Sequence, residues 1–154
     1  MAKISTDLIR KLRDETGAAV MRIKTVLEEV KGNEKKALEI LKKEGFEKVA
    51  KRADRETGQG IVVSYIHHSN KVGVLVEILT ETDFVAKNDL TLTLGKEIAL
   101  QIASMNPENN KELEDQDFVK DPSKKISELV KDVIAKTGEN IKIGKFTRFE
   151  IGKR

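Results

Sequence analysis

The chain has 154 residues and a formal net charge of +3, because 29 basic residues are interleaved with 26 acidic ones; this balance demands no polyanionic partner. Cysteine is absent, which excludes a disulfide framework, a thiolate nucleophile and a cysteine-based zinc site. No apolar run approaches the ~20 residues that a membrane span requires, so we expect a cytoplasmic protein with no membrane partner.

The first fifty-four residues show the spacing of amphipathic helices. We predict helices over residues 5–12, 18–31 and 34–44, with a further helical stretch from Phe46 to Ala53. The N-cap candidates are Ser5 and Asn33, and the residues expected to end the helices are Gly17, Gly32 and Gly45. Short helices joined by single-glycine corners predict a compact three-helix bundle.

The pattern changes after a polar segment with two glycines, which we interpret as a linker. Residues 61–66 and 72–79 are rich in β-branched side chains and flank a polar turn, so they predict a β-hairpin. We then expect a helix over 83–105, an irregular connection over 108–123 anchored by Phe118, a helix capped by Ser123 and ended by Gly138, and a strand over 141–151 with a bulge at Gly144.

These elements predict an α+β protein with two domains. The first is a three-helix bundle over residues 1–54, and a linker over 55–60 follows it. The second, over 61–154, is a small core in which an antiparallel sheet packs on helices.

The run Thr82-Asp83-Phe84-Val85 stands where a predicted strand gives way to a predicted helix. One interpretation is a capped helix start, in which Thr82 or Asp83 caps the N-terminus and Phe84 packs inward. The other is an exposed aromatic and acidic pair that enters a partner protein. Spacing alone favours the capped start.

The other motifs do not indicate a metal site, a phosphate-binding loop or a catalytic set. His67 and His68 are adjacent strand residues that point to opposite faces, so they disfavour a shared metal ion. Gly95-Lys96 lacks the earlier glycine of a phosphate-binding loop. No Ser/His/Asp set or paired-carboxylate spacing stands out, and we predict no catalytic residue and no cofactor.

Four blocks span nearly the whole chain. In chain order they are Leu12-Arg13-Asp14-Glu15-Thr16-Gly17-Ala18, Glu81-Thr82-Asp83-Phe84-Val85-Ala86-Lys87-Asn88, Glu97-Ile98-Ala99-Leu100-Gln101-Ile102-Ala103 with Met105-Asn106-Pro107, and Thr137-Gly138-Glu139-Asn140-Ile141. Together they resemble the translation elongation factor Ts family. The resemblance implies an N-terminal domain like ubiquitin-associated domains, followed by an α+β core.

The same resemblance implies a guanine-nucleotide exchange factor for elongation factor Tu, without covalent chemistry. Such a factor binds the GDP-loaded partner, promotes GDP release by disturbing its Mg²⁺ and phosphate site, and leaves a nucleotide-free complex. Phe84 would insert its ring near the nucleotide, with Asp83 making a polar contact beside it, while Thr82 and Val85 fix the turn. This role requires Phe84 to be exposed in the free protein.

The resemblance also assigns partner contacts to the N-terminal domain, through Leu12, Arg13 and Met21. The chain departs from the family pattern at three places. Ala19-Val20-Met21 and Arg22-Ile23 stand where Gly-Met-Met and an acid-Cys pair are common, the connection between Pro107 and Leu113 is short, and Gly144-Lys145 replaces two arginines. Short family members resemble half of a longer core, and a homodimer is one state that this implies.

Two alternatives stay open. The helices over residues 34–54 have a basic face that includes Lys42 and Lys43, as an RNA-binding module would require, although interspersed acids and the lack of aromatic platforms disfavour nucleic acid. The N-terminal helical domain alone would serve a peptide-binding adaptor.

Overall fold

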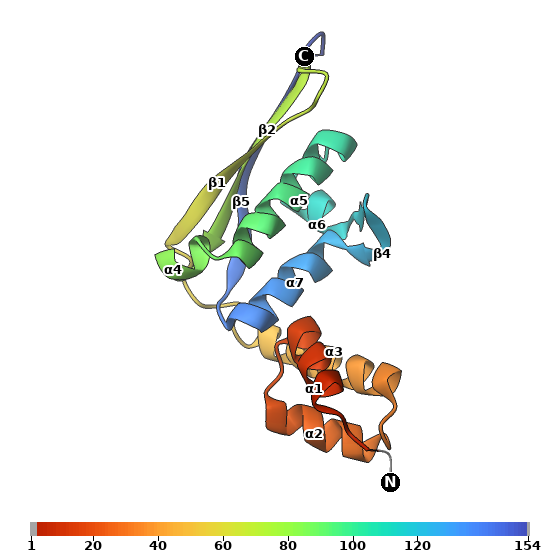
Figure 1. Ribbon diagram of the computed structural model, residues 1–154. Helices are drawn as coiled ribbons and strands as arrows, with labels where there is room; N and C mark the ends of the chain where they lie inside the picture. Colours follow the sequence, from red (N-terminus) through yellow and green to blue (C-terminus); the bar gives the residue numbers. More distant parts are fainter. Residues whose placement is uncertain (1–2, 154) are drawn as a thin grey trace.

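The computed structural model describes residues 3–153, so residues 1, 2 and 154 of the two predicted domains lie outside the described residues (Figure 1). The helices are α1 (Thr6–Thr16), α2 (Val20–Glu29), α3 (Glu34–Ala50), α4 (Asp83–Ala86), α5 (Asp89–Met105), α6 (Asn110–Asp115) and α7 (Ile126–Thr137). The strands are β1 (Gln59–Ile66), β2 (Val72–Thr80), β3 (Asp117–Phe118), β4 (Asp121–Lys125) and β5 (Ile141–Glu150). The predicted α+β class is confirmed.

The first three helices are capped largely as their sequence predicts. The Ser5 hydroxyl accepts a hydrogen bond from the Leu8 amide, and the Asn33 side chain accepts one from the Lys36 amide. Gly17 ends α1 in the left-handed region at φ 70°, where a side chain is disfavoured. The apolar stripes meet in a cluster of Leu12, Ile23, Val26, Leu27, Ala37 and Leu41.

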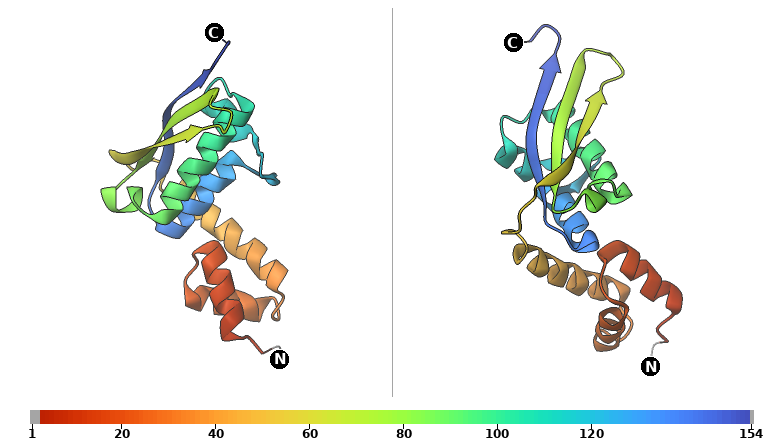
Figure 2. Two further views of the ribbon diagram at one scale, coloured as in Figure 1. Left: turned by 45° about the horizontal axis from the view of Figure 1, so that its top comes forward. Right: turned by 90° about the vertical axis from the view of Figure 1, so that its left-hand side faces the viewer.

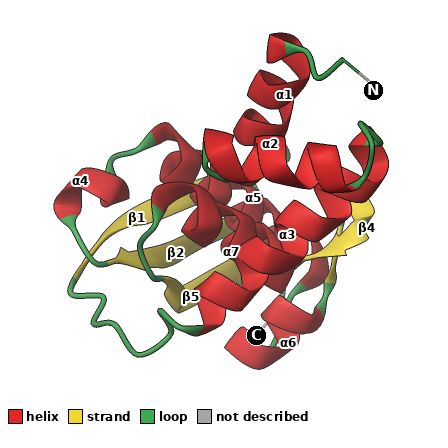
Figure 3. Ribbon diagram, turned by 90° about the horizontal axis from the view of Figure 1, so that it is seen from below, coloured by secondary structure: helices red, strands yellow, loops and turns green. Residues whose placement is uncertain are grey.

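The prediction that Gly45 ends the third helix is wrong, because α3 continues through it to Ala50. A glycine inside a helix costs about 1 kcal/mol relative to alanine, which packing can outweigh. The second half of α3 lies along α7, and Val49 is buried in the apolar cluster that underlies the sheet. Figure 3 shows α3 beside α7.

The main sheet is antiparallel in the order β1-β2-β5. Strand β1 begins at Gln59, two residues earlier than the predicted strand. The bulge expected at Gly144 is confirmed, because the register of β5 against β2 shifts between the partners of Val76 and Ile78. The Glu77 carboxylate, opposite the shift, accepts the Lys145 amide at 3.0 Å. The bulged backbone group therefore keeps a partner.

The helix predicted over residues 83–105 is two helices. Asn88 separates α4 from α5 and caps α5 by accepting the Leu90 amide at 2.9 Å. The Thr91 hydroxyl donates to the Val85 carbonyl at 2.7 Å and ties the short α4 to α5. Because the apolar spacing of a helix continues across Asn88, the sequence pattern did not indicate an N-cap at this residue.

The segment predicted as irregular contains α6 and the small hairpin of β3 and β4. Phe118 is buried, as expected, but Ser123 is not a helix cap: it lies in β4 and its hydroxyl bonds Asp121, while Lys125 precedes α7. The fully buried Gln101 of α5 holds the hairpin, since its amide donates to the Asp117 carbonyl and accepts the Val119 amide.

Helices α5 and α7 lie behind the main sheet when it is viewed from its open side (Figure 2, right). The other face of the sheet carries large apolar side chains that stay exposed. Val62 and Ile66 come from β1, Leu75 from β2, and Phe149 from β5, with Ile151 just beyond it. Within the described chain, no helix has the length and apolar character needed to cross a bilayer.

Candidate functional site

The segment from Thr80 to Val85 leaves β2 and enters α4 in a tightly bonded turn. The Thr80 hydroxyl donates to the Thr82 carbonyl at 2.7 Å. The Thr82 hydroxyl accepts the Val85 amide at 3.3 Å, so Thr82 is the N-cap of α4. The capped helix start predicted from the sequence is therefore correct for Thr82.

The inward packing of Phe84 in the capped-start interpretation is wrong, and the ring has the exposure that entry into a partner requires. Its side chain is 86% exposed, whereas Val85 is 8% exposed and Ala86 is fully buried. The turn is thus anchored through Val85 in the apolar cluster under the sheet, and it presents the Phe84 ring to solvent. The phenyl ring on this anchored turn is therefore available for contact with another molecule.

Asp83 stands beside the ring and is engaged within the chain. Its carboxylate lies 2.8 Å from the Lys87 ammonium, one helical turn away. That hydrogen bond is the main cause that raises the pKa of Lys87, with the charge of Asp83 as the second cause. Both side chains are largely exposed, so a partner can exchange this ion pair for its own contacts at little cost.

The turn has a second support that sequence reasoning missed. The Glu139 carboxylate, just after α7, accepts the Thr82 amide at 3.0 Å and the Thr82 hydroxyl at 2.8 Å. The next residue, Asn140, donates its backbone amide to the Glu81 carboxylate at 2.6 Å. The available signal was the fourth sequence block, which contains Glu139 and Asn140 but shows no partner for them.

Asn140 also reaches the segment that precedes the sheet. Its side-chain amide donates to the carbonyls of Ala53 at 3.3 Å and Arg55 at 2.9 Å. The Arg55 guanidinium lies 3.6 Å from the Glu81 carboxylate. Residues 53–55, 81–82 and 139–140 therefore meet at the base of the turn.

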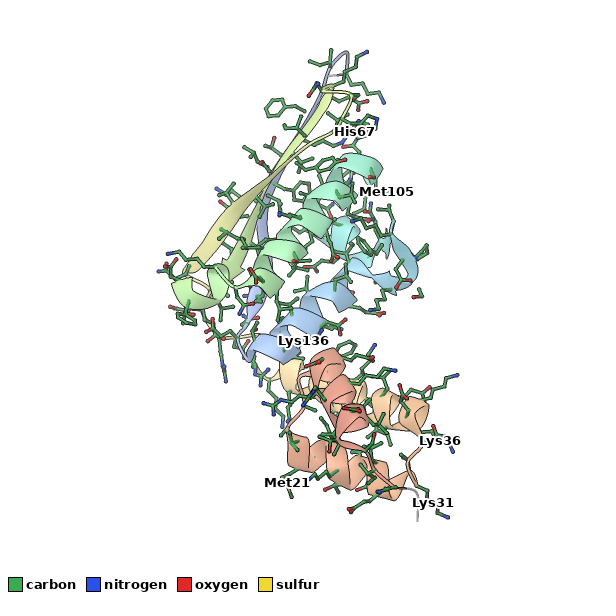
Figure 4. All side chains as sticks on the ribbon, viewed as in Figure 1. Met21, Lys31, Lys36, His67, Met105 and Lys136 are labelled. Carbon is green, nitrogen blue, oxygen red and sulfur yellow. The ribbon has the colours of Figure 1, made fainter. Side chains whose placement is uncertain are left out.

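The three predicted contact residues of the N-terminal helices differ in exposure. Leu12 is fully buried in the three-helix core, so its side chain offers no contact surface while the helices stay packed. Arg13 is exposed on α1, and Met21 is 71% exposed on α2. Figure 4 shows Met21 at the left-hand end of the N-terminal helices.

A hollow of about 280 Å³ runs between α1 and α2 beside Arg13. Its lining combines apolar and cationic side chains: Thr6, Ile9, Arg10, Arg13, Val20 and Lys24. Arg10 and Lys24 are exposed here and were not singled out from the sequence. A cationic hollow of this kind suits an acidic segment of a partner.

Comparison with known proteins adds an independent finding. A sequence model of the family described as "Elongation factor TS" matches residues 81–154, which include the turn and its support. The chain is similar to proteins named "Elongation factor Ts" from Thermosipho melanesiensis, Thermotoga neapolitana and Thermotoga maritima, each at 37% identity. The similarity covers 97–98% of this chain and 98–100% of those proteins. The alignment with the Thermosipho protein extends over 195 positions, so that protein has segments that the 154 residues of this chain lack.

Proposed function

The chain belongs to the elongation factor Ts family of translation elongation factors, and from this premise we propose that it is a guanine-nucleotide exchange factor for elongation factor Tu. It binds the GDP-loaded partner, speeds GDP release and remains on the nucleotide-free form until GTP displaces it. Exchange needs no covalent step and no cofactor, and the proposed place of action is the cytoplasm. The observation that carries the proposal is the exposed Phe84 on its anchored turn.

Exchange of this kind follows from thermodynamic linkage. A factor that binds the empty partner more tightly than the loaded one must weaken nucleotide binding by the same ratio. A thousandfold ratio corresponds to about 4 kcal/mol of differential binding. The factor must therefore make contacts that the GDP-loaded partner can accept only by distorting its Mg²⁺ and phosphate site.

Phe84 is suited to this task because its ring is exposed and its side chain has few rotatable bonds. Its ring is already in water, so insertion into an apolar crevice of the partner gains burial that the free protein lacks. A phenylalanine has two side-chain torsions, and fixing them costs little entropy. Asp83, Thr82 and Val85 complete the proposed site: the first as the adjacent polar contact, the others as cap and anchor.

The N-terminal helices supply the second proposed contact. Arg13 and Met21 are exposed and meet the partner's nucleotide domain, while the buried Leu12 supports α1 from inside. Because Met21 and Phe84 are both exposed, one partner can contact both side chains. Binding energy from the helices then helps to hold Phe84 in place.

The decisive experiment measures release of labelled GDP from elongation factor Tu with the Phe84→Ala variant. Loss of a central aromatic anchor typically costs about 2 kcal/mol or more, or a fall of roughly 30-fold in stimulated release. Thermal unfolding of the variant should match that of the wild type, because the lost ring contacts are few. Met105→Ala, which truncates a side chain that is 50% exposed at the end of α5, is the matched control and should keep full activity. An undiminished rate of stimulated GDP release with Phe84→Ala excludes the proposed insertion of the Phe84 ring into the partner.

We also propose the division into residues 1–54, 55–60 and 61–154 as domains and linker. Two separate apolar clusters support it, one within α1–α3 and one beneath the sheet. Val49 is the exception, since it belongs to the second cluster. The likeness of the first unit to ubiquitin-associated domains stays a prediction.

A homodimer is the last part of the proposal. The apolar sheet face formed by Val62, Ile66, Leu75, Phe149 and Ile151 is the observation that supports it. Contiguous exposed apolar faces mark interaction sites, and a two-fold pair buries the same face of both copies. The turn that carries Phe84 lies outside this set of residues and stays available to the partner.

A further inference from the structure

The base of the Phe84 turn joins three distant parts of the chain. Building on the exchange function, we propose that Glu139 and Asn140 are positioning residues that lock this turn to the segment joining the N-terminal helices to the sheet. Both residues act on the backbone that carries the ring, since Glu139 is hydrogen-bonded to Thr82, and Asn140 is hydrogen-bonded to Glu81, Ala53 and Arg55.

Glu139 fixes the first residue of the turn. One of its carboxylate oxygens accepts both the Thr82 amide, at 3.0 Å, and the Thr82 hydroxyl, at 3.1 Å. The same hydroxyl accepts the Val85 amide, so the carboxylate orients the cap as well as the backbone before it. Hydrogen bonds to an ionised acceptor are stronger than neutral ones.

Asn140 fixes the turn to the segment before the sheet. It is 3% exposed, and its side-chain amide donates to the Ala53 and Arg55 carbonyls while its backbone amide donates to Glu81. An aspartate has the same size but presents an oxygen to two carbonyl oxygens, so it cannot replace the amide. The chemistry of the position therefore requires a donor.

The Arg55 guanidinium completes the junction. It lies 3.6 Å from Glu81, and it donates to the Gly138 carbonyl at 3.4 Å at the end of α7. The Glu81 carboxylate, Asn140 and Arg55 thus each contact the other two, and together they join the segment before β1 to the end of β2. A connected network of this kind holds backbone more rigidly than its separate bonds would.

Rigidity at this place bears directly on exchange. The Phe84 side chain is 86% exposed, and α4 is a single turn of four residues. When the Phe84 ring inserts into a partner, the turn that carries the ring experiences an equal and opposite force. A flexible turn would be displaced by that force, and the partner's nucleotide site would then stay undistorted. Misplacement of a reacting or positioning group by about 1 Å can cost up to two orders of magnitude in rate.

The test compares Glu139→Ala with Glu139→Gln. Since a glutamine carbonyl can accept both Thr82 hydrogen bonds, it should keep most of the stimulated GDP release, whereas alanine should lower the maximal stimulated rate about tenfold. The half-saturating concentration should change little, because the exposed contact residues are all retained. Amide hydrogen exchange over residues 82–88 should speed up in the alanine variant and stay slow in the glutamine variant.

Asn140→Asp provides the second comparison. Amide hydrogen exchange should speed up over residues 53–58 as well as 82–88, and the maximal rate of stimulated GDP release should fall. If this variant does not fold, the comparison of Glu139→Ala with Glu139→Gln tests the proposal by itself. Wild-type exchange rates for the turn amides in Glu139→Ala, or an unchanged maximal GDP release, overturn the proposal. If the wild-type chain itself fails to stimulate release, the exchange function falls, while the amide exchange still decides whether Glu139 and Asn140 hold the turn.

Discussion

Arg22 links two helices of the N-terminal domain through charged groups. Its guanidinium forms a two-point hydrogen-bonded pair with Glu44 of α3 and lies 3.5 Å from Glu29. The hydrogen bond from Arg22 is the main cause that lowers the pKa of Glu44, while partial burial opposes it. The pair joins α2 to α3 beside the proposed partner contact at Met21.

The lowered pKa of Glu44 predicts a pH-dependent stability. A carboxyl whose folded pKa lies below its unfolded value contributes stability that is present above the unfolded value, here about 4.5, and is lost as pH falls through the folded value. The Glu44→Gln variant should therefore be less stable than the wild type at pH 7, and the gap should close as the pH is lowered below 4.5.

Chemical denaturation at a series of pH values checks this prediction. Glu39→Gln, a change at an exposed residue of the same helix, is the control and should show no such narrowing. A gap between wild type and Glu44→Gln that is constant from pH 7 to pH 3.5 would falsify the role given to the pair.

At the scale of elements, local chemistry predicted most helix and strand positions but not every end. Ser5, Asn33 and Gly138 act as predicted because caps and left-handed ends depend on nearby residues alone. The helix end predicted at Gly45 was wrong because α3 continues through Gly45 where it packs on α7, and such a tertiary contact is not visible in the local sequence. Asn88 was missed because the apolar spacing is continuous across the break between α4 and α5.

Some residues of the candidate site could also be predicted from the sequence, and others could not. Thr82 and Phe84 stand out in a single run of sequence, so the turn could be identified from the sequence and its resemblance. The residues that hold the turn could not, because Glu139 lies 57 positions from Thr82 and Asn140 lies 59 positions from Glu81. Only the pairing of β2 with β5 brings them together.

Two glycines inside helices predict opposite effects of alanine. At Gly45 an added Cβ would lie 3.6 Å from the Ala135 Cβ, an ordinary contact, so Gly45→Ala should stabilise the protein by about 0.5–1 kcal/mol through helix propensity. At Gly95 the added Cβ would lie 2.5 Å from Cγ2 of the buried Val63, so Gly95→Ala should destabilise by about 1 kcal/mol or more despite the same propensity.

Urea unfolding of both variants measures the difference directly. The midpoint should rise for Gly45→Ala and fall for Gly95→Ala, with similar slopes. A fall for both would mean that α3 and α7 approach more closely than the 3.6 Å spacing indicates.

At the scale of the molecule, the N-terminal helices are docked and not merely tethered. Val49 enters the cluster beneath the sheet, and the Arg52 guanidinium donates to the Ile134 carbonyl at 3.4 Å. An added Cβ at Gly17 would lie 2.9 Å from the Lys136 Cα, so the end of α1 approaches α7 closely. The Lys131 ammonium lies 5.6 Å from the centre of the Phe46 ring. These contacts hold the proposed surface around Met21 at a set place relative to Phe84.

The uncovered sheet face predicts that the chain pairs with a second copy. Leu75 lies on the central strand, is 46% exposed, and is flanked by the exposed Val62, Ile66 and Phe149. A lysine there would bring two like charges together across a two-fold axis and would leave them without water, so Leu75→Lys should dissociate the pair.

Sedimentation equilibrium tests the pairing. Wild type should sediment at twice the 17.3 kDa of one chain, and Leu75→Lys at the mass of a single chain. Val119→Lys is the matched control, because Val119 is 38% exposed and lies between β3 and β4, away from the main sheet, so this variant should remain paired. Because pairing stabilises the folded chain by mass action, the Tm of wild type should also rise with protein concentration, while that of Leu75→Lys should not. A wild-type chain that sediments as a monomer at tens of micromolar leaves the apolar face to some other partner, and the exchange activity of Phe84 would then belong to a single copy.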